Sequence, residues 1–107
     1  MPTTARKSKG TRARRKASYS YQVGLHTNIS KSNMPARPLG SQLDHIVPKE
    51  FGFKHNIPPE LIGSKENLQW LPFNENIQKG TRITGEAIRV LRVWHLEDLA
   101  DVYEGRI

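Results

Sequence analysis

The sequence predicts a small α+β domain, and three features carry that prediction. Two short segments, residues 42–47 and 67–73, have the β-branched and alternating apolar side chains of strands. Residues 84–103 repeat apolar side chains every three or four positions, which is the period of an amphipathic helix. Residues 1–18 hold seven Lys and Arg residues and no acidic residue, so this segment is predicted to be a disordered, flexible basic arm.

The length and charge of the chain indicate one domain with a basic extension. At 107 residues the chain is long enough for a single modest core, which we place in residues 19–107. The formal net charge of +7 lies entirely in the arm, because the rest of the chain has equal numbers of basic and acidic residues. A polyanion is therefore the predicted partner of the arm. A solubilising tail or a targeting signal is the alternative reading.

Several classes of protein are excluded by what the sequence lacks. The chain has no cysteine, which excludes disulfides and a cysteine-bound structural zinc. No apolar run follows the arm, as a secretory signal would require. No segment approaches the roughly 20 apolar residues of a membrane span. We therefore expect a cytoplasmic protein without a membrane partner.

The elements before the second strand are predicted in order along the chain. Residues 19–42 are expected to form a loop, with one short strand near Tyr19–Val23. The first strand of the domain, residues 42–47, is expected to stop at Pro48. A long loop should follow, with "PPELIG" forming one helical turn that Gly63 ends. Apolar side chains are expected to anchor this loop: Phe51, Phe53, Ile57, Leu61 and Ile62.

The second strand, residues 67–73, is expected to lead directly into helices. Asn74 is the predicted N-cap of a helix that runs to about Lys79. Thr84 is the predicted cap of a single C-terminal helix over residues 84–103, with His95 packed on its apolar side. The core is expected to form where the C-terminal helix packs against three side chains of the second strand: Trp70, Leu71 and Phe73.

The stretch "LDHIVPKEF", residues 43–51, places an aspartate beside a histidine where the first strand ends. Metal-assisted phosphodiester cleavage needs a general base, and a neutral imidazole with an ordinary pKa of about 6.5 suits that role. It also needs a divalent cation, and hard cations such as Mg²⁺ prefer oxygen ligands. Asp44, His45 and the amide oxygens of Asn67 and Asn76 supply these groups. Neighbours on a strand point to opposite faces, so Asp44 and His45 are expected to converge only because the strand ends there.

The segments "LDHIVPKEF" and "ENLQWLPFNENIQKG" resemble the HNH endonucleases, whose core is the ββα-metal (His-Me finger) fold. The resemblance covers residues 42–80 and implies a role for each matching position. His45 resembles the general base that activates water. Asp44 and Asn76 resemble the metal ligands, and Asn67 resembles the asparagine that fixes the loop and orients the base.

The resemblance also implies a cofactor and a substrate. One divalent ion, Mg²⁺ or Mn²⁺, is expected, because asparagine rather than histidine stands at position 76. Many relatives have cysteine pairs that bind a structural zinc, and this chain departs from them. The expected activity is hydrolysis of DNA, most simply double-stranded DNA, with the cation stabilising the leaving 3′-oxygen. The residues expected to contact nucleic acid are Lys79, Arg82, Arg12, Arg14, Arg15 and Lys16.

Two other functions fit the same sequence. One is a nuclease-like module that binds nucleic acid without cutting it, and the other is a basic structural or assembly protein. A small, freestanding domain of this type suggests a phage or bacterial source by analogy. The sequence leaves open base specificity, nicking against double-strand cleavage, RNA as substrate, the native metal, the oligomeric state and the biological role. His55 is interpreted as an ordinary loop residue.

Overall fold

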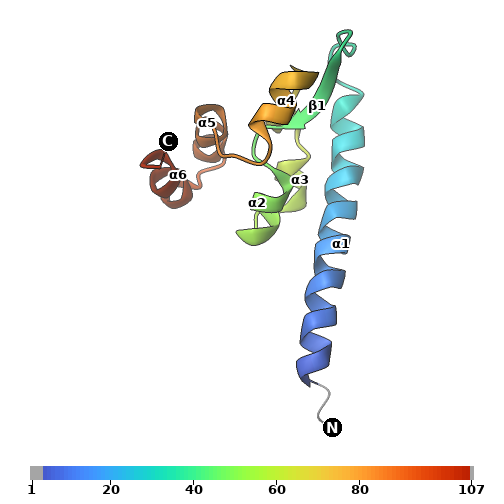
Figure 1. Cartoon of the computed structure of the whole chain (residues 1–107), viewed down its shortest axis with the longest axis vertical. Coiled ribbons are helices and arrows are strands. Elements are labelled where there is room, and N and C mark those ends of the chain that lie inside the picture. The colour runs from blue at the N-terminus through green and yellow to red at the C-terminus, as the bar shows by residue number, and fades with distance from the viewer. Residues whose placement is uncertain (1–3, 107) are drawn as a thin grey trace.

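The computed structural model describes residues 4–106, with side chains for residues 11–106. Its elements in chain order are α1 (Thr4–Lys31), β1 (Ser41–His45), α2 (Lys49–Lys54), α3 (Pro59–Ile62), η1 (Lys65–Asn67), β2 (Leu68–Pro72), α4 (Phe73–Lys79), α5 (Gly85–Val93) and α6 (Glu97–Glu104). The predicted α+β class is confirmed. Figure 1 shows α1 along one side of the molecule and α5 and α6 on the other.

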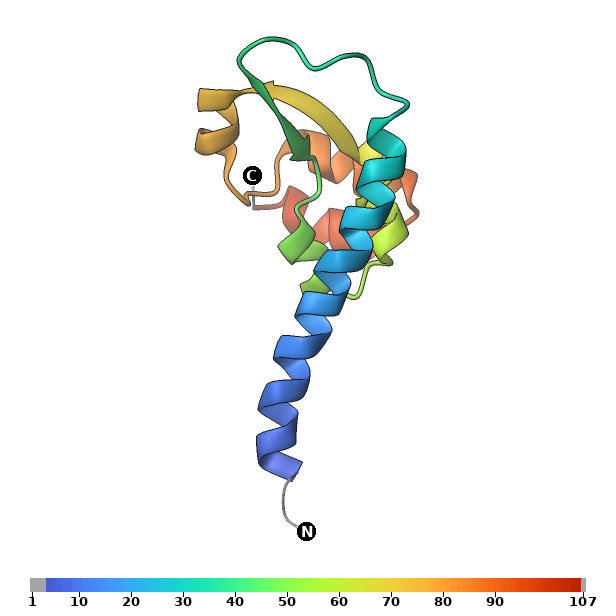
Figure 2. The ribbon, with the colours of Figure 1, turned by 90° about the vertical axis from the view of Figure 1, so that its right-hand side faces the viewer.

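The predicted disordered arm is wrong for residues 4–18, which form the first half of the 28-residue helix α1. The predicted loop and short strand at residues 19–31 are helical as well, so the proposed boundary after residue 18 lies inside one helix. No proline stands between Pro2 and Pro35, and Lys, Arg and Ala favour a helix. Residues 1–3 lie outside the described residues. The first half of α1 extends beyond the rest of the molecule (Figure 2).

The second half of α1 is part of the domain because its inner side packs on α2, α3 and η1. Val23 is fully buried in the core. The Tyr19 hydroxyl donates to the Ile57 carbonyl at 2.6 Å, and burial raises the pKa of Tyr19 to about 12. Ser30 donates to the Gly63 carbonyl at 2.6 Å. This inner side mixes polar and apolar residues, so it lacks the apolar stripe by which a helix is recognised in a sequence.

The two predicted strands form an antiparallel hairpin, in which Asp44 pairs with Gln69 and His45 with Leu68. The long segment between the strands is not structureless, since it folds into α2, α3 and η1. The helical turn predicted for "PPELIG" is α3, and Gly63 ends it as expected. Helix α4 begins at Phe73 with Pro72 as its cap, so Asn74 lies in the first turn and is not the N-cap.

The core lies under the α2–α3 segment and α5, not at the end of β2. Its buried apolar residues include Val23, Val47, Phe51, Ile57, Ile62, Ala87, Ile88, Val90, Leu91 and Ala100. The three residues predicted to build it lie largely outside: Phe73 is 52% exposed, and Trp70 and Leu71 are only half-buried. The apolar alternation of β2 predicted that these side chains are buried. The side of the two-stranded sheet that carries Leu71 is covered only in part, because α4 is short.

The predicted single C-terminal helix is two helices. Thr84 caps α5 as predicted, since its Oγ1 accepts the Ala87 N–H at 3.2 Å. Helix α5 ends in a Schellman motif, in which Leu96 N bonds to Leu91 O and His95 N bonds to Arg92 O. His95 takes the left-handed conformation that this motif needs, with φ 62°, and it is exposed rather than packed.

Over the residues that the structure describes, no helix combines the length and the apolar character needed to cross a membrane.

Candidate functional site

Asp44 lies on the face of the hairpin that α4 covers, and it is buried. Its Oδ1 pairs with the ammonium of Lys79 at 3.0 Å, and its Oδ2 accepts from Gln69 Nε2 at 2.9 Å. Lys79 is also buried and donates to the main-chain carbonyl of His45 at 3.1 Å. The end of β1 is therefore tied to the end of α4 by a buried ion pair.

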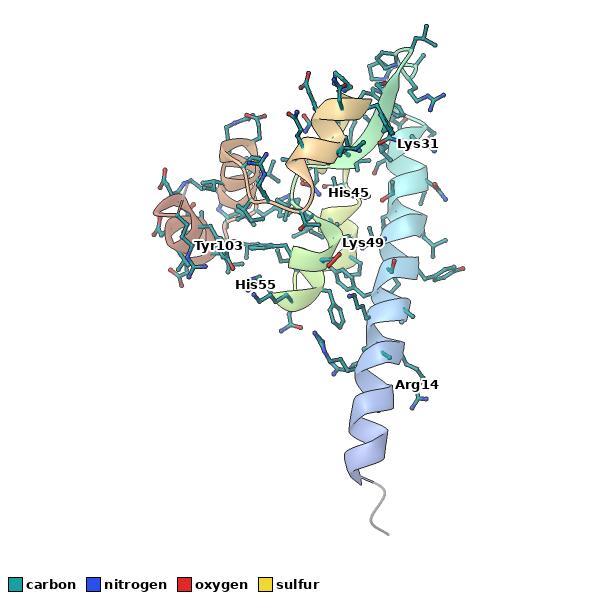
Figure 3. The ribbon with its side chains drawn as sticks, in the orientation of Figure 1. Arg14, Lys31, His45, Lys49, His55 and Tyr103 are labelled. Atoms are coloured by element: carbon teal, nitrogen blue, oxygen red, sulfur yellow. The ribbon has the colours of Figure 1, made fainter. Side chains whose placement is uncertain are left out.

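His45 lies on the opposite face of the strand. Its Nε2 is 3.0 Å from Thr27 Oγ1, so the ring contacts α1 while Asp44 contacts α4. The expected convergence of the two side chains does not occur, because β1 keeps its regular pairing through His45 and neighbouring side chains alternate. Figure 3 shows His45 between α4 and α1, above Lys49 at the start of α2.

The environment of His45 favours the neutral imidazole. Burial is the largest cause that lowers its pKa, the ammonium of Lys49 is the next, and the carboxylate of Asp44 acts in the opposite direction. The imidazole is therefore able to accept a proton near neutral pH. In the tautomer in which Nε2 carries the hydrogen and donates it to the Thr27 hydroxyl, Nδ1 is unprotonated. Nδ1 is then the ring nitrogen that accepts the proton.

Asn67 is fully buried and closes the segment between the strands. Its Oδ1 accepts the Val47 N–H at 2.7 Å, and its Nδ2 donates to the carbonyls of Val47 and Ile62 at 3.1 and 2.8 Å. Val47 lies two residues after the end of β1, and Ile62 ends α3. One side chain thus joins both ends of the segment. These are the side-chain-to-backbone contacts expected for a residue that fixes this loop. Because Val47 is two residues from His45, the contacts also restrain the backbone at His45.

Asn76 lies on α4 one turn before Lys79, on the side that faces the hairpin. Its Nδ2 donates to Gln42 Oε1 at 2.9 Å, and Gln42 shares a strand face with Asp44. The amide oxygen of Asn76 has no hydrogen bond to the described side chains or backbone. Asp44 and Asn76 are therefore brought to the same face of the hairpin by α4.

These residues have the donor types that suit a hard divalent cation, and the pair fits the few protein ligands that Mg²⁺ usually takes. Each carboxylate oxygen has two lone-pair sites, so Lys79 and Gln69 leave Asp44 capacity for a further partner. However, the Lys79 ammonium already neutralises this carboxylate, which opposes a second cation beside it. Within residues 11–106, no group of three or more His, Cys, Asp and Glu side chains has the spacing of a metal site.

The structure separates the basic residues that were predicted to contact nucleic acid. Arg12, Lys16 and Arg82 line one cavity, although they come from α1 and from the turn after α4. Arg15 lines a different, smaller hollow. Arg14 points away from α2 and α6 (Figure 3). Lys79 is buried in its pair with Asp44 and is not on the surface.

Sequence reasoning missed four residues at or near the site. Gln69 lies opposite Asp44 in the strand pairing, so aligning the two strands in the sequence would have identified it. Thr27, which contacts His45, has no local signal, because it is 18 residues away on a helix that was not predicted. Lys54 and Arg106 line the same cavity as Arg12, and only the packing of α2 and α6 brings them there.

The remaining histidines are structural or peripheral. His55 ends α2, and its ring packs against Phe51 at a centroid distance of 4.4 Å. Its Nε2 is 3.4 Å from the Tyr103 hydroxyl, and Figure 3 shows the two side chains facing each other between α2 and α6. Burial, with a smaller effect of Lys54, lowers the pKa of His55. The residue thus joins α2 to α6 and is distant from Asp44.

Comparison of the chain with protein-family models, curated proteins and solved structures gives no match.

Proposed function

We propose that the protein is a metal-dependent endonuclease of the HNH type, with a ββα-metal core formed by β1, β2 and α4. The observation that carries the proposal is the environment of His45 at the end of β1. Its Nε2 contacts Thr27, and burial lowers its pKa. The segment that follows it is closed by Asn67. A neutral, restrained imidazole is what a general base near neutral pH requires. The proposed substrate is double-stranded DNA.

In this mechanism His45 takes a proton from the attacking water through Nδ1. Thr27 holds the ring through Nε2, and Asn67 restrains the backbone that carries it. Asp44 and Asn76 would hold one Mg²⁺ or Mn²⁺ ion, which when bound stabilises the negative charge on the leaving 3′-oxygen. Because His45 and Asp44 face opposite sides of β1, this mechanism requires the phosphodiester to lie across the end of the strand, between the two sides. Lys79, buried at the same carboxylate, adds positive charge beside the cation site rather than at the surface.

The test is cleavage of supercoiled plasmid with Mg²⁺, with Mn²⁺ or with EDTA. We expect relaxation or linearisation that requires metal and is lost in His45→Ala. His26→Ala is the matched control, since it removes a histidine from α1 that makes no hydrogen bond with the described residues, and it should cut like the wild type. Equal cleavage by wild type and His45→Ala would refute the assignment of the base.

Thr27 provides a sharper test of how the base is held. Thr27→Val keeps the shape of the side chain and removes the hydroxyl, so the ring of His45 loses its partner. We expect kcat to fall by about tenfold, which corresponds to ~1.4 kcal/mol, while KM changes little. Thr27→Ser should restore kcat. A fall in kcat that Ser does not rescue would point to packing rather than to the hydrogen bond.

A second candidate function is a module that binds nucleic acid without cutting it. The observation that favours it is the engagement of both Asp44 oxygens by Lys79 and Gln69, which leaves the site neutralised by protein groups. In that case DNA should bind in a salt-dependent way, and no metal should support cleavage of the plasmid. Binding should then be equal in wild type and His45→Ala.

A further inference from the structure

A second site is lined by residues of α1, α2, the segment between α4 and α5, and α6 with the turn after it. It is a cavity of about 980 Å³, large enough for a ligand of several rings. Five basic residues line it, against the single carboxylate of Glu50: Arg12, Lys16, Lys54, Arg82 and Arg106. The aromatic side chains in its wall are Phe51, Phe53 and Tyr103.

The basic residues of this cavity have no acidic partner among the residues whose side chains are described. None of the five takes part in an ion pair there. Arg92, outside the cavity, shows the contrast, because it pairs with three carboxylates: Glu97, Asp101 and Glu104. Like charges that converge on one hollow repel each other unless an anion is bound between them. The cavity therefore has the charge of an anion site.

Three of the arginines are held in place by groups other than carboxylates. Arg12 lies over the ring of Phe53, with its Cζ 5.2 Å from the centroid. Arg106 lies over Tyr103 at 4.8 Å, from the opposite wall of the cavity. Arg82 donates through Nε to the main-chain carbonyl of Lys79 at 3.2 Å. Stacking orients a guanidinium and leaves its N–H groups free to bind phosphate oxygens.

The shape of the site distinguishes between kinds of nucleic acid. Proteins read duplex DNA by inserting a convex element, such as a helix, into a groove. Here the basic residues line a hollow. The guanidinium planes of Arg12 and Arg106, which lie over Phe53 and Tyr103, supply faces on which unpaired bases stack. Cationic grooves with aromatic side chains are the usual sites for single strands. The cavity also adjoins the candidate site, because Arg82 contacts Lys79 and Lys79 pairs with Asp44.

We propose that this cavity binds a short single-stranded segment of the nucleic-acid substrate, next to the bond that is cut. The inference rests on the proposed function in taking the ligand to be that substrate. It implies that, among double-stranded DNA substrates, the protein prefers those in which an unpaired strand adjoins the duplex, such as a flap or a branch. The phosphates contact the N–H groups of the five basic side chains, and the bases stack on the guanidinium planes of Arg12 and Arg106.

The experiment measures binding of a fluorescently labelled single-stranded thymidine oligonucleotide by anisotropy, in EDTA, over a range of salt. The test variant is Lys54→Gln/Arg106→Gln, because both side chains are exposed and come from α2 and from the turn after α6. Arg37→Gln/Arg89→Gln is the matched control, since it removes the same charge from exposed positions outside the cavity. Circular dichroism verifies that both fold.

We expect the test variant to bind the oligonucleotide at least tenfold more weakly than the wild type, and the control to change binding less than threefold. The slope of log K against log salt should fall by about 0.7 for each phosphate that the variant no longer neutralises. Binding of a duplex of equal length should be less affected than binding of the single strand.

Equal weakening in the test variant and the control would overturn the proposal, since net charge alone would then explain binding. A stronger effect on the duplex than on the single strand would also overturn it. These outcomes are independent of cleavage. If the oligonucleotide binds as expected and no metal supports cutting of either the plasmid or a duplex with a single-stranded flap, the proposed nuclease activity fails while the cavity's assignment stands.

Discussion

At the scale of single residues, the site depends on contacts between side chains that are far apart in the sequence. His45 reaches Thr27, Asp44 reaches Lys79, and Asn67 joins Val47 to Ile62. Each of these contacts satisfies a buried polar group that would otherwise be costly to bury. None of the buried side-chain polar atoms in the described residues lacks a hydrogen-bond partner. The end of β1 is therefore held by hydrogen bonds as well as by the apolar packing of Ile46 and Val47.

The buried pair of Asp44 and Lys79 makes the first prediction. Lys79→Met keeps the length of the side chain and leaves a buried carboxylate without its counter-charge, so it should lower the free energy of unfolding by about 3–5 kcal/mol. Asp44→Asn should also destabilise, and the double variant should be destabilised by less than the sum of the two. Urea unfolding of the four proteins measures this coupling.

Arg89→Met is the control for that cycle, since it breaks the exposed pair between Arg89 and Glu86. Exposed ion pairs contribute little, so no measurable change in the unfolding midpoint is expected. If the double variant is destabilised by the full sum of the single effects, the ion pair does not stabilise the end of β1 in the way that the structure indicates.

At the scale of elements, α1 and α3 approach so closely that only glycine fits between them. A Cβ built on Gly63 would lie 2.7 Å from His26 Cβ and 2.8 Å from the Thr27 backbone nitrogen. Gly63 therefore has two roles, since it also ends α3 and lets the turn pass close to α1. The sequence indicated the first role, because "PPELIG" predicts a helical turn. The second role depends on α1, which was not predicted because the basic charge of residues 1–18 indicated disorder.

Two glycine substitutions test this contact with opposite expected signs. Gly63→Ala should destabilise the protein by about 1–3 kcal/mol, because the neighbour is α1 backbone and cannot move aside easily. Gly24→Ala, in the interior of α1, meets nothing within 4 Å. It should stabilise by about 1 kcal/mol, since alanine favours a helix more than glycine does. The midpoints of thermal unfolding measure both changes.

Destabilisation by Gly24→Ala would contradict the helical assignment of α1 at that position. A neutral Gly63→Ala would show that α1 does not lie against α3 in solution, and would leave Thr27 without its contact to His45.

At the scale of the whole molecule, α1 is both the longest element and a wall of the domain. At 1.5 Å per residue its 28 residues span about 42 Å, and this accounts for most of the 55 Å length of the molecule. Its second half packs on α2 and α3, while its first half carries basic residues beyond the core. One helix thus joins the charged surface of the molecule to the residue that contacts His45.

Two truncations test this division. Residues 17–107 keep the packed half of α1, including Tyr19, Val23 and Thr27, and should unfold cooperatively near the temperature of the full chain. Residues 34–107 lack α1 and leave core residues such as Ile62 uncovered, so they should not fold cooperatively. Circular dichroism and amide NMR spectra distinguish the two. A folded fragment 34–107 would restore the view that the N-terminal region is only an appended arm.

The sequence by itself determined what depends on neighbours within about four residues. The two strands, the α3 turn and the Thr84 cap follow from short patterns. Asp44, His45 and Asn67 were selected as candidate site residues from short patterns as well. Tertiary structure decided the rest. Residues 4–31 became a helix, and the mixed polar and apolar inner side of its second half packs on α2 and α3. Helix α5 ended at Val93, and Lys54 and Arg106 met Arg12 in one cavity. The physical reason is that the partners of these polar and charged side chains lie far away in the sequence. Packing of the helices brings the partners together, and the residues next to each side chain do not indicate which partners they are.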